Sequence, residues 1–137
     1  MSSITLLVVV LAIAAVLLML SSSRSSAARA QREQWINADE MLTRAESKFL
    51  VGEFAEAEYL FQSAFLKAEK VDTLLASEAL YGIARVRMRH SRFAEAVPIL
   101  EQALALKSSW PVAKPNFEQL LARELERARA EASSASR

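Results

Sequence analysis

Three side chains near the middle of the sequence have the types and the spacing needed to bind an acidic partner. Arg85 and Arg89 lie four residues apart, and Tyr81 precedes Arg85 by the same interval, so a helix would place all three on one face. Such a face suits charge-assisted hydrogen bonds to an acidic or aromatic segment of another protein. The alternative is an ordinary solvated basic face, because Arg87 and Arg92 are also basic and would point elsewhere.

Residues for catalysis or metal binding do not occur in a suitable pattern. The chain has no Cys, which excludes disulfides, thiolate zinc sites and Cys nucleophiles, and His90 is its single histidine. The sequence has no Ser-His-Asp set, Gly-rich phosphate loop or carboxylate pair in an apolar setting, and its net charge is only +1. We therefore expect no enzyme activity, no cofactor, no metal and no nucleic-acid partner, and we expect His90 to cap a helix.

A short motif occurs twice and indicates how the chain is organised. Phe54-Ala55-Glu56-Ala57 returns 39 residues later as Phe93-Ala94-Glu95-Ala96. A bulky residue and a further Ala extend each copy at the same spacing: Phe61 and Ala64 in the first, Leu100 and Ala103 in the second. A fixed period of this size is typical of stacked helical hairpins, which usually bind other proteins.

Composition and periodicity predict an all-α chain. Gly and Pro are scarce after the N-terminal apolar run, and helix-forming Ala, Leu, Glu, Arg and Gln dominate. Apolar residues at steps of three and four predict helices over about 27–51, 54–70, 74–90, 93–106 and 115–132. Gly52, Asp72-Thr73 and Ser91 are expected at the breaks between them, and residues 133–137 are expected to fray.

Both copies of the motif resemble the tetratricopeptide repeat. In that family an aromatic residue opens the second helix of a hairpin, and Ala, a bulky residue and Ala follow at steps of three, four and three. The resemblance covers roughly residues 38–108, with Ala45 and Ala84 at the small-residue position of each first helix and Pro98 where the family often has proline. The spacing of 39 residues exceeds the family period of about 34 and implies an extension around Glu69 to Leu74.

The resemblance implies a groove lined by the first helix of each hairpin. Matched by position, it assigns six partner-binding residues: Leu42, Glu46, Phe49, Tyr81, Arg85 and Arg89. The same faces also carry four further residues: Asp39, Leu50, Glu78 and Met88. Trp35 and Trp110 are additional candidate anchors for a partner, with packing inside the chain as the alternative for each. The final helix resembles the polar capping helix of such arrays.

An apolar run of 17 residues, Ile4 to Leu20, is interrupted only by Thr5 and reaches the lower limit for a helix that crosses a bilayer. No Lys or Arg precedes it, whereas Arg24, Arg29 and Arg32 follow, so the positive-inside rule places the N-terminus outside and the C-terminal body in the cytoplasm. A cleaved signal peptide is the alternative, but its usual basic start is missing.

The sequence thus predicts four parts: a transmembrane anchor (1–23), a Ser- and Arg-rich collar with helix lead-in (24–37), two repeats (38–108), and a capping helix with a frayed tail (109–137). We expect a single-pass scaffold or accessory subunit of a larger complex in a bacterial inner membrane or an organelle membrane, with other subunits and the bilayer as partners. The alternative is a cytosol-facing peptide receptor of the mitochondrial outer-membrane import type. Two repeats are fewer than the usual three, so stability is expected to depend on a partner or on self-association.

Overall fold

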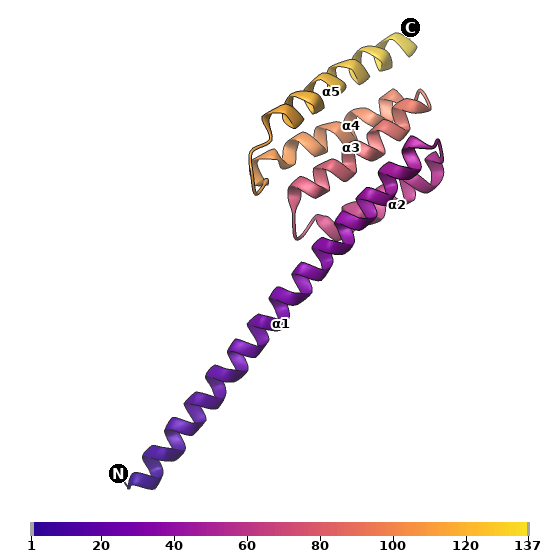
Figure 1. The fold of residues 1–137 in the computed structure, drawn as a ribbon. Helices are drawn as coiled ribbons and strands as arrows, with labels where there is room; N and C mark the ends of the chain where they lie inside the picture. Colours follow the sequence, from indigo (N-terminus) through magenta and orange to yellow (C-terminus); the bar gives the residue numbers. More distant parts are fainter. Residues whose placement is uncertain (1, 137) are drawn as a thin grey trace. The chain divides into compact units, whose positions relative to one another are not determined.

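In the computed structural model, which describes residues 2–136, the chain forms five α-helices and no strand (Figure 1). The helices are α1 (Ser3–Leu50), α2 (Phe54–Ala68), α3 (Thr73–Arg89), α4 (Phe93–Ala105) and α5 (Pro115–Ala135), and a 3-10 helix, η1 (Leu106–Ser109), follows α4. The predicted all-α fold is confirmed.

The contacts divide the chain into two units, residues 1–33 and residues 34–137. The first unit is the N-terminal part of α1, where every side chain from Ile4 to Leu20 is exposed. This part of the chain holds one helical segment that is long and apolar enough to cross a membrane. The Ser-rich residues 21–26 are helical too, so the collar continues this helix and is not an irregular linker.

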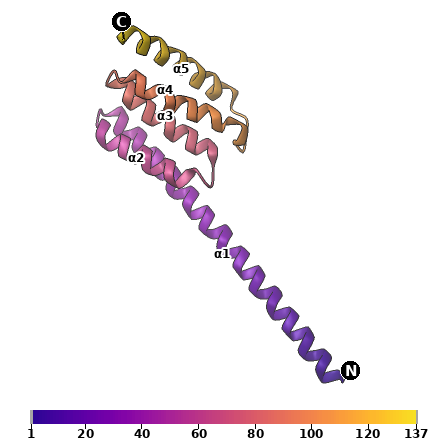
Figure 2. The same cartoon turned by 180° about the vertical axis from the view of Figure 1, so that it is seen from behind.

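In the second unit, residues 34–137, the helices pack in the order in which they follow one another. α2 and α4 pack on α3, and α5 packs on α4 (Figures 1 and 2). The turns from α1 to α2, α2 to α3 and α3 to α4 span only three or four residues, which makes each helix antiparallel to the next. We refer to this unit as the helical body.

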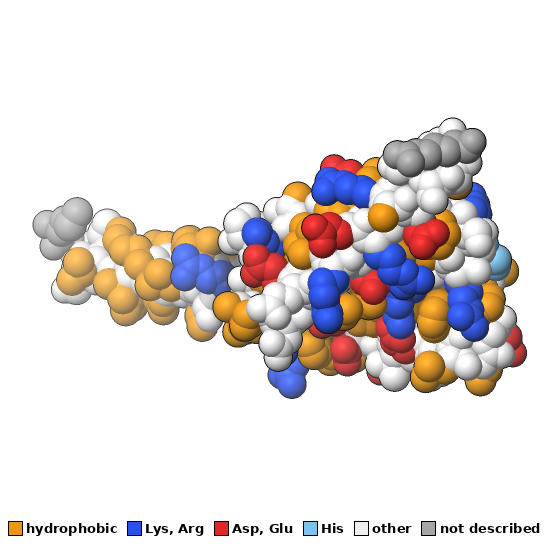
Figure 3. Space-filling model, turned by 90° about the horizontal axis from the view of Figure 1, so that it is seen from above, with side chains coloured by type: hydrophobic (Ala, Val, Ile, Leu, Met, Phe, Trp, Pro, Cys, Tyr) orange, Lys and Arg blue, Asp and Glu red, His pale blue; other side chains and the backbone are white. Residues whose placement is uncertain are grey.

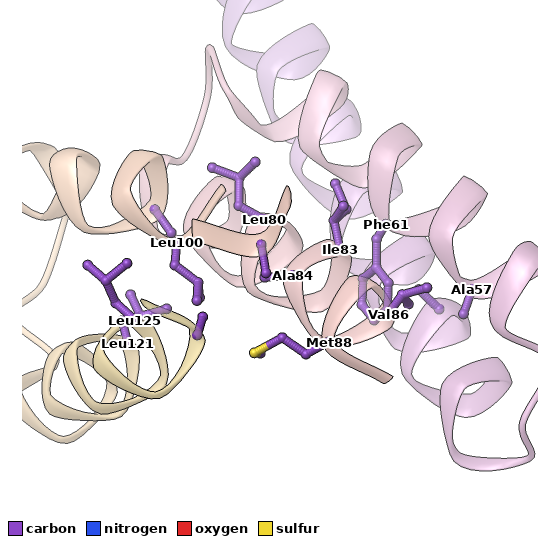
Figure 4. Close-up of a cluster of buried hydrophobic side chains, with 14 of the residues drawn as sticks. Ala57, Phe61, Leu80, Ile83, Ala84, Val86, Met88, Leu100, Leu121 and Leu125 are labelled. Carbon is purple, nitrogen blue, oxygen red and sulfur yellow. The ribbon is translucent and has the colours of Figure 1, made fainter. Parts of the chain in front are cut away.

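The core of the helical body combines small residues at helix contacts with a few large side chains. Figure 4 shows Leu80, Ile83 and Ala84 of α3 between Phe61 of α2 and the leucines of α4 and α5. Phe61, Leu100 and Leu121 are the largest fully buried apolar side chains. Their contacts with alanines allow close helix approach without voids.

One glycine is required by this packing. Gly82 faces Phe61 so closely that a Cβ atom at position 82 would overlap the ring. The glycine therefore lets α3 approach α2 at the point where the largest core side chain lies.

The helix ends follow the expected local chemistry. Gly52 ends the first turn with a φ of +83°, and Ser91 forms the corresponding turn after α3 with a φ of +60°. Asp72 caps α3, because its Oδ1 accepts hydrogen bonds from the backbone N–H groups of Leu74 (3.0 Å) and Leu75 (3.3 Å). His90 follows α3 directly, and its backbone N–H bonds to carbonyls of the last turn.

The C-terminal part of the helical body differs from the expectation in two places. Residues 133–135 belong to α5, although the sequence led us to expect a frayed tail. Ala130, Ala132 and Ala135 favour the helix there, and Ala132 is half-buried. The other difference is η1, a 3-10 helical turn that follows α4 directly and was not expected from the sequence.

Candidate partner-binding groove

A hollow of about 330 Å³ opens on the helical body between α1, α3 and α5. Seven side chains line it: Phe49, Tyr81, Arg85, Met88, Arg89, Glu124 and Arg127. The four from α3 recur at steps of four, three and one, so they occupy one face of that helix. We call this hollow the groove.

Aromatic contacts support the apolar wall of the groove. The Phe49 ring meets Phe54 edge-on at 5.3 Å between centroids, and the Tyr81 ring meets Phe117 of α5 at 6.0 Å. Met88 closes the floor and is almost fully buried. These side chains are thus fixed by their neighbours before any ligand arrives.

The Arg85 guanidinium contacts aromatic rings and a carboxylate. Its guanidinium carbon lies 4.6 Å from the centre of the Phe49 ring and 4.9 Å from that of Tyr81. The guanidinium also forms an ion pair with Glu46, which links α3 to α1. Stacked cations and partly buried ion pairs order a side chain. Arg85 therefore shapes the groove more than it offers a free charge.

Arg89 differs from Arg85, because its side chain is exposed and has no ion-pair partner among residues 2–136. Its guanidinium carbon lies 5.8 Å from the Phe54 ring. Across the groove, Arg127 donates to Glu124 at 3.3 Å within α5, and the Arg127 side chain is 59% exposed. An exposed pair of this kind is weak and can exchange for another carboxylate. Arg89 and Arg127 are thus the two cations available to a ligand.

The charges on the α1 and α3 faces change sign along the helices. Burial raises the pKa of Glu78, with Lys114 opposing the shift and the nearby carboxylates of Asp72 and Asp39 adding to it. Burial likewise raises the pKa of Tyr81, while Arg85 acts in the opposite direction. Carboxyl groups thus lie toward the N-terminal end of these faces, whereas the guanidinium groups of Arg85 and Arg89 lie toward the other end.

The structure brings together most of the residues assigned to the groove from sequence. Phe49, Tyr81, Arg85 and Arg89 line it, and Glu46 contacts it through Arg85. Leu42 does not line it, because this side chain is half-buried and packs against the core.

Of two further predicted positions, one lines the groove and the other does not. Met88 is part of the groove, whereas Leu50 is 80% exposed and lies outside it. The sequence reading missed Glu124 and Arg127, because α5 lies beyond the repeated motif. The alternating charges of this helix in the sequence favour ion pairs within it, such as the one between Arg127 and Glu124, and do not by themselves indicate a groove.

Both candidate tryptophan anchors make hydrogen bonds within the helical body. Trp35 Nε1 donates to Asp72 Oδ2 at 2.9 Å, and the side chain remains 41% exposed. Trp110 Nε1 donates to Ser77 Oγ at 2.9 Å, and Ser77 Oγ donates to the Ala103 carbonyl at 2.9 Å. Trp110 also packs on Phe117. These contacts give both indoles a structural role.

Among residues 2–136, no three His, Cys, Asp or Glu side chains gather in a way that could hold a metal ion. No protein-family model, curated protein or solved structure matches the chain. The function must therefore be inferred from the groove and from the apolar segment of α1.

Proposed function

We propose that this chain is a membrane-anchored scaffold or accessory subunit, whose helical body docks on a protein partner within a larger membrane complex. The observation that carries the proposal is the groove, where an ordered apolar wall lies beside the exposed guanidinium of Arg89. Protein-binding sites commonly combine aromatic contact area with a few arginines.

The packing of the repeated motif supports tetratricopeptide-like hairpins. Ala57 and Ala96 are both fully buried, and so are the bulky residues that follow them, Phe61 and Leu100. Equivalent positions thus perform equivalent packing in the two hairpins. Repeats of this kind typically present one continuous surface to a partner.

The groove fits a peptide segment that carries a carboxylate beside an aromatic or aliphatic side chain. The apolar side chain would contact Phe49 and Tyr81, and the carboxylate would pair with Arg89 or replace Glu124 at Arg127. The partner is thus an acidic and apolar stretch of a protein, ordered on binding.

The apolar segment of α1 supports an anchor in the bilayer. Its exposed side chains would be costly in water but favourable in lipid. We place the N-terminal side of the segment outside and the helical body in the cytoplasm, because Arg24, Arg29 and Arg32 follow the segment closely.

Photo-crosslinking tests the docking proposal. A crosslinking amino acid at position 89 of the full chain, in native membranes, should capture one partner, whereas the same group at exposed Gln62 of α2 should not. The Arg89→Glu and Arg127→Glu double variant, with the crosslinker moved to position 49, should reduce capture about tenfold, equivalent to about 1.4 kcal/mol. Arg123→Glu is the matched control, because Arg123 is exposed on α5 and does not line the groove.

Two results would count against docking through the groove. One is equal capture from positions 89 and 62, and the other is a chain that leaves the membrane in mild detergent only as a monodisperse monomer. An import receptor would lose a transient cargo in the double variant while its complex stayed assembled. A scaffold would lose the complex itself.

A further inference from the structure

The first 32 residues carry charge of one sign only. They contain Arg24, Arg29 and Arg32 but no Asp or Glu, and the first acidic residue is Glu33. The remaining fourteen Lys and Arg and all sixteen Asp and Glu follow, so the rest of the chain has a net charge of −2. The basic excess of the protein is therefore concentrated directly after the apolar run. Figure 3 shows Lys and Arg side chains next to the apolar side chains along this part of α1.

The three arginines point in related directions. At about 100° per residue, they fall within an arc of roughly 140° on α1. Small side chains occupy the same arc, and Arg24 borders a shallow hollow lined by Leu17, Leu20, Ser21, Arg24, Ser25 and Ala28. Two hydroxyl groups and one guanidinium thus border this open hollow next to the last apolar residues.

The distances along the helix match the depth of lipid headgroups. With a rise of about 1.5 Å per residue, Arg24 lies about 6 Å beyond Leu20, and Arg32 lies about 18 Å beyond it. The headgroup layer on each side of a bilayer is about 5–8 Å thick. Arg24 therefore falls at phosphate level, and Arg29 and Arg32 lie farther out, where attraction to a charged surface weakens over a Debye length of about 8 Å.

We propose that this face of α1 binds the headgroups of anionic phospholipids. Arg24 donates to the lipid phosphate, the Ser21 and Ser25 hydroxyls donate to the same group, and Arg29 and Arg32 add longer-range attraction. Small side chains around Arg24 leave room for the headgroup. The proposal rests on the membrane anchoring stated above, and it is independent of the groove. The adjoining 17-residue apolar run favours a lipid over an acidic protein or a nucleic acid as the ligand.

Spin-labelled lipids provide the test. The full chain is reconstituted into phosphatidylcholine vesicles with a minor fraction of phosphatidylglycerol, and electron paramagnetic resonance measures which labelled lipid lies at the protein surface. We expect about fivefold selectivity for phosphatidylglycerol over phosphatidylcholine, from attraction of about 1 kcal/mol at Arg24. Arg24→Gln should remove most of it, Arg29→Gln less, and Arg32→Gln least. The control is a triple variant, Arg44→Gln, Lys70→Gln, Arg123→Gln, which removes more positive charge than any of the single variants. It should keep full selectivity, because these exposed residues belong to the helical body.

Flotation separates headgroup binding from membrane anchoring. It compares neutral phosphatidylcholine vesicles with anionic vesicles that also contain phosphatidylglycerol. A chain that floats with neutral vesicles but shows no selectivity, or selectivity that survives Arg24→Gln, would overturn headgroup binding and leave the anchor intact. A chain that floats only with anionic vesicles, and only with its arginines, would overturn the transmembrane anchor and, with it, the placement of Arg24 at phosphate level, because its binding would be to the charged surface alone. A chain that floats with neither would overturn both, and docking through the groove would stand or fall by crosslinking.

Discussion

Glu46 of α1 and Arg85 of α3 form an ion pair, and the two residues are 39 positions apart, the same interval that separates the two copies of the motif. The repeat thus placed an acid and a base at equivalent positions of successive hairpins. Because the first helices of the two hairpins are parallel neighbours, these positions meet. The pair, together with the contacts of the Arg85 guanidinium with the Phe49 and Tyr81 rings, connects the hairpins at the groove.

The first prediction concerns the contribution of this ion pair to the free energy of unfolding. Arg85→Met should destabilise the chain by about 1–2 kcal/mol, because it removes the contacts of the guanidinium with three rings, those of Phe49, Tyr81 and Phe61, and leaves Glu46 unpaired. The Glu46 side chain is 40% exposed, so the direct coupling measured by a cycle with Glu46→Gln should be no more than about 1 kcal/mol. Thermal unfolding of the full chain in mild detergent, followed by circular dichroism, measures both. Arg89→Met is the control, and an equal loss there would contradict a special role for Arg85.

The second prediction compares two residues with positive φ. Ser91→Gly should stabilise the chain by about 1 kcal/mol, because a side chain is strained at a φ of +60° and glycine is not. Gly52→Ala should destabilise by a similar amount at a φ of +83°. No heavy atom lies within 4 Å of a Cβ at position 52, so the effect there comes from the backbone alone. Changes of the same sign in the two melting temperatures would refute this explanation.

The third prediction concerns the contact between Gly82 and Phe61. Gly82→Ala should cost about 1–3 kcal/mol, although alanine is the better helix former, because its Cβ overlaps a fully buried ring. Phe61→Leu should relieve part of that cost, so the double variant should be more stable than the sum of the two single changes predicts. Chemical denaturation of the three variants measures this, and simple additivity would argue against the clash.

The fourth prediction concerns pH. Burial raises the pKa of Glu78, so the folded chain binds the proton more tightly than the unfolded chain does. The stability from this group is therefore complete below the unfolded pKa of about 4.3 and is lost as pH rises through the raised folded pKa. Glu78→Gln should accordingly raise the free energy of unfolding at pH 7 by less than about 1 kcal/mol after allowance for solvent screening. Chemical denaturation at the two pH values measures this gain, which should vanish below about pH 4. A gain that persists at low pH would mean that charge is not its cause.

Much of the fold could be predicted because local chemistry determines it. Phe54 and Phe93 begin α2 and α4, and the breaks at Gly52, Asp72 and Ser91 lie where turn and cap residues occur. The repeat also indicated which face of each first helix is shared, and that was enough to find most of the groove.

The remaining details depend on contacts between distant segments. Leu42 and Phe49 lie on the same face of α1 and both pack against the core, yet only Phe49 also lines the groove. The repeat interval relates Glu46 to Arg85, but the contacts of the Arg85 guanidinium with the Phe49 and Tyr81 rings depend on how the side chains pack. Glu124 and Arg127 join the groove only through the packing of α5 on α4.

The hydrogen-bond chain from Trp110 through Ser77 to the Ala103 carbonyl has a kinetic consequence. It attaches the segment before α5 to both α3 and α4, and Trp110 packs on Phe117 in the first turn of α5. The α5 side of the groove therefore stays in position when no ligand is bound. Association with a partner should then be a single step whose rate rises linearly with partner concentration, without the plateau that a slow opening step would impose.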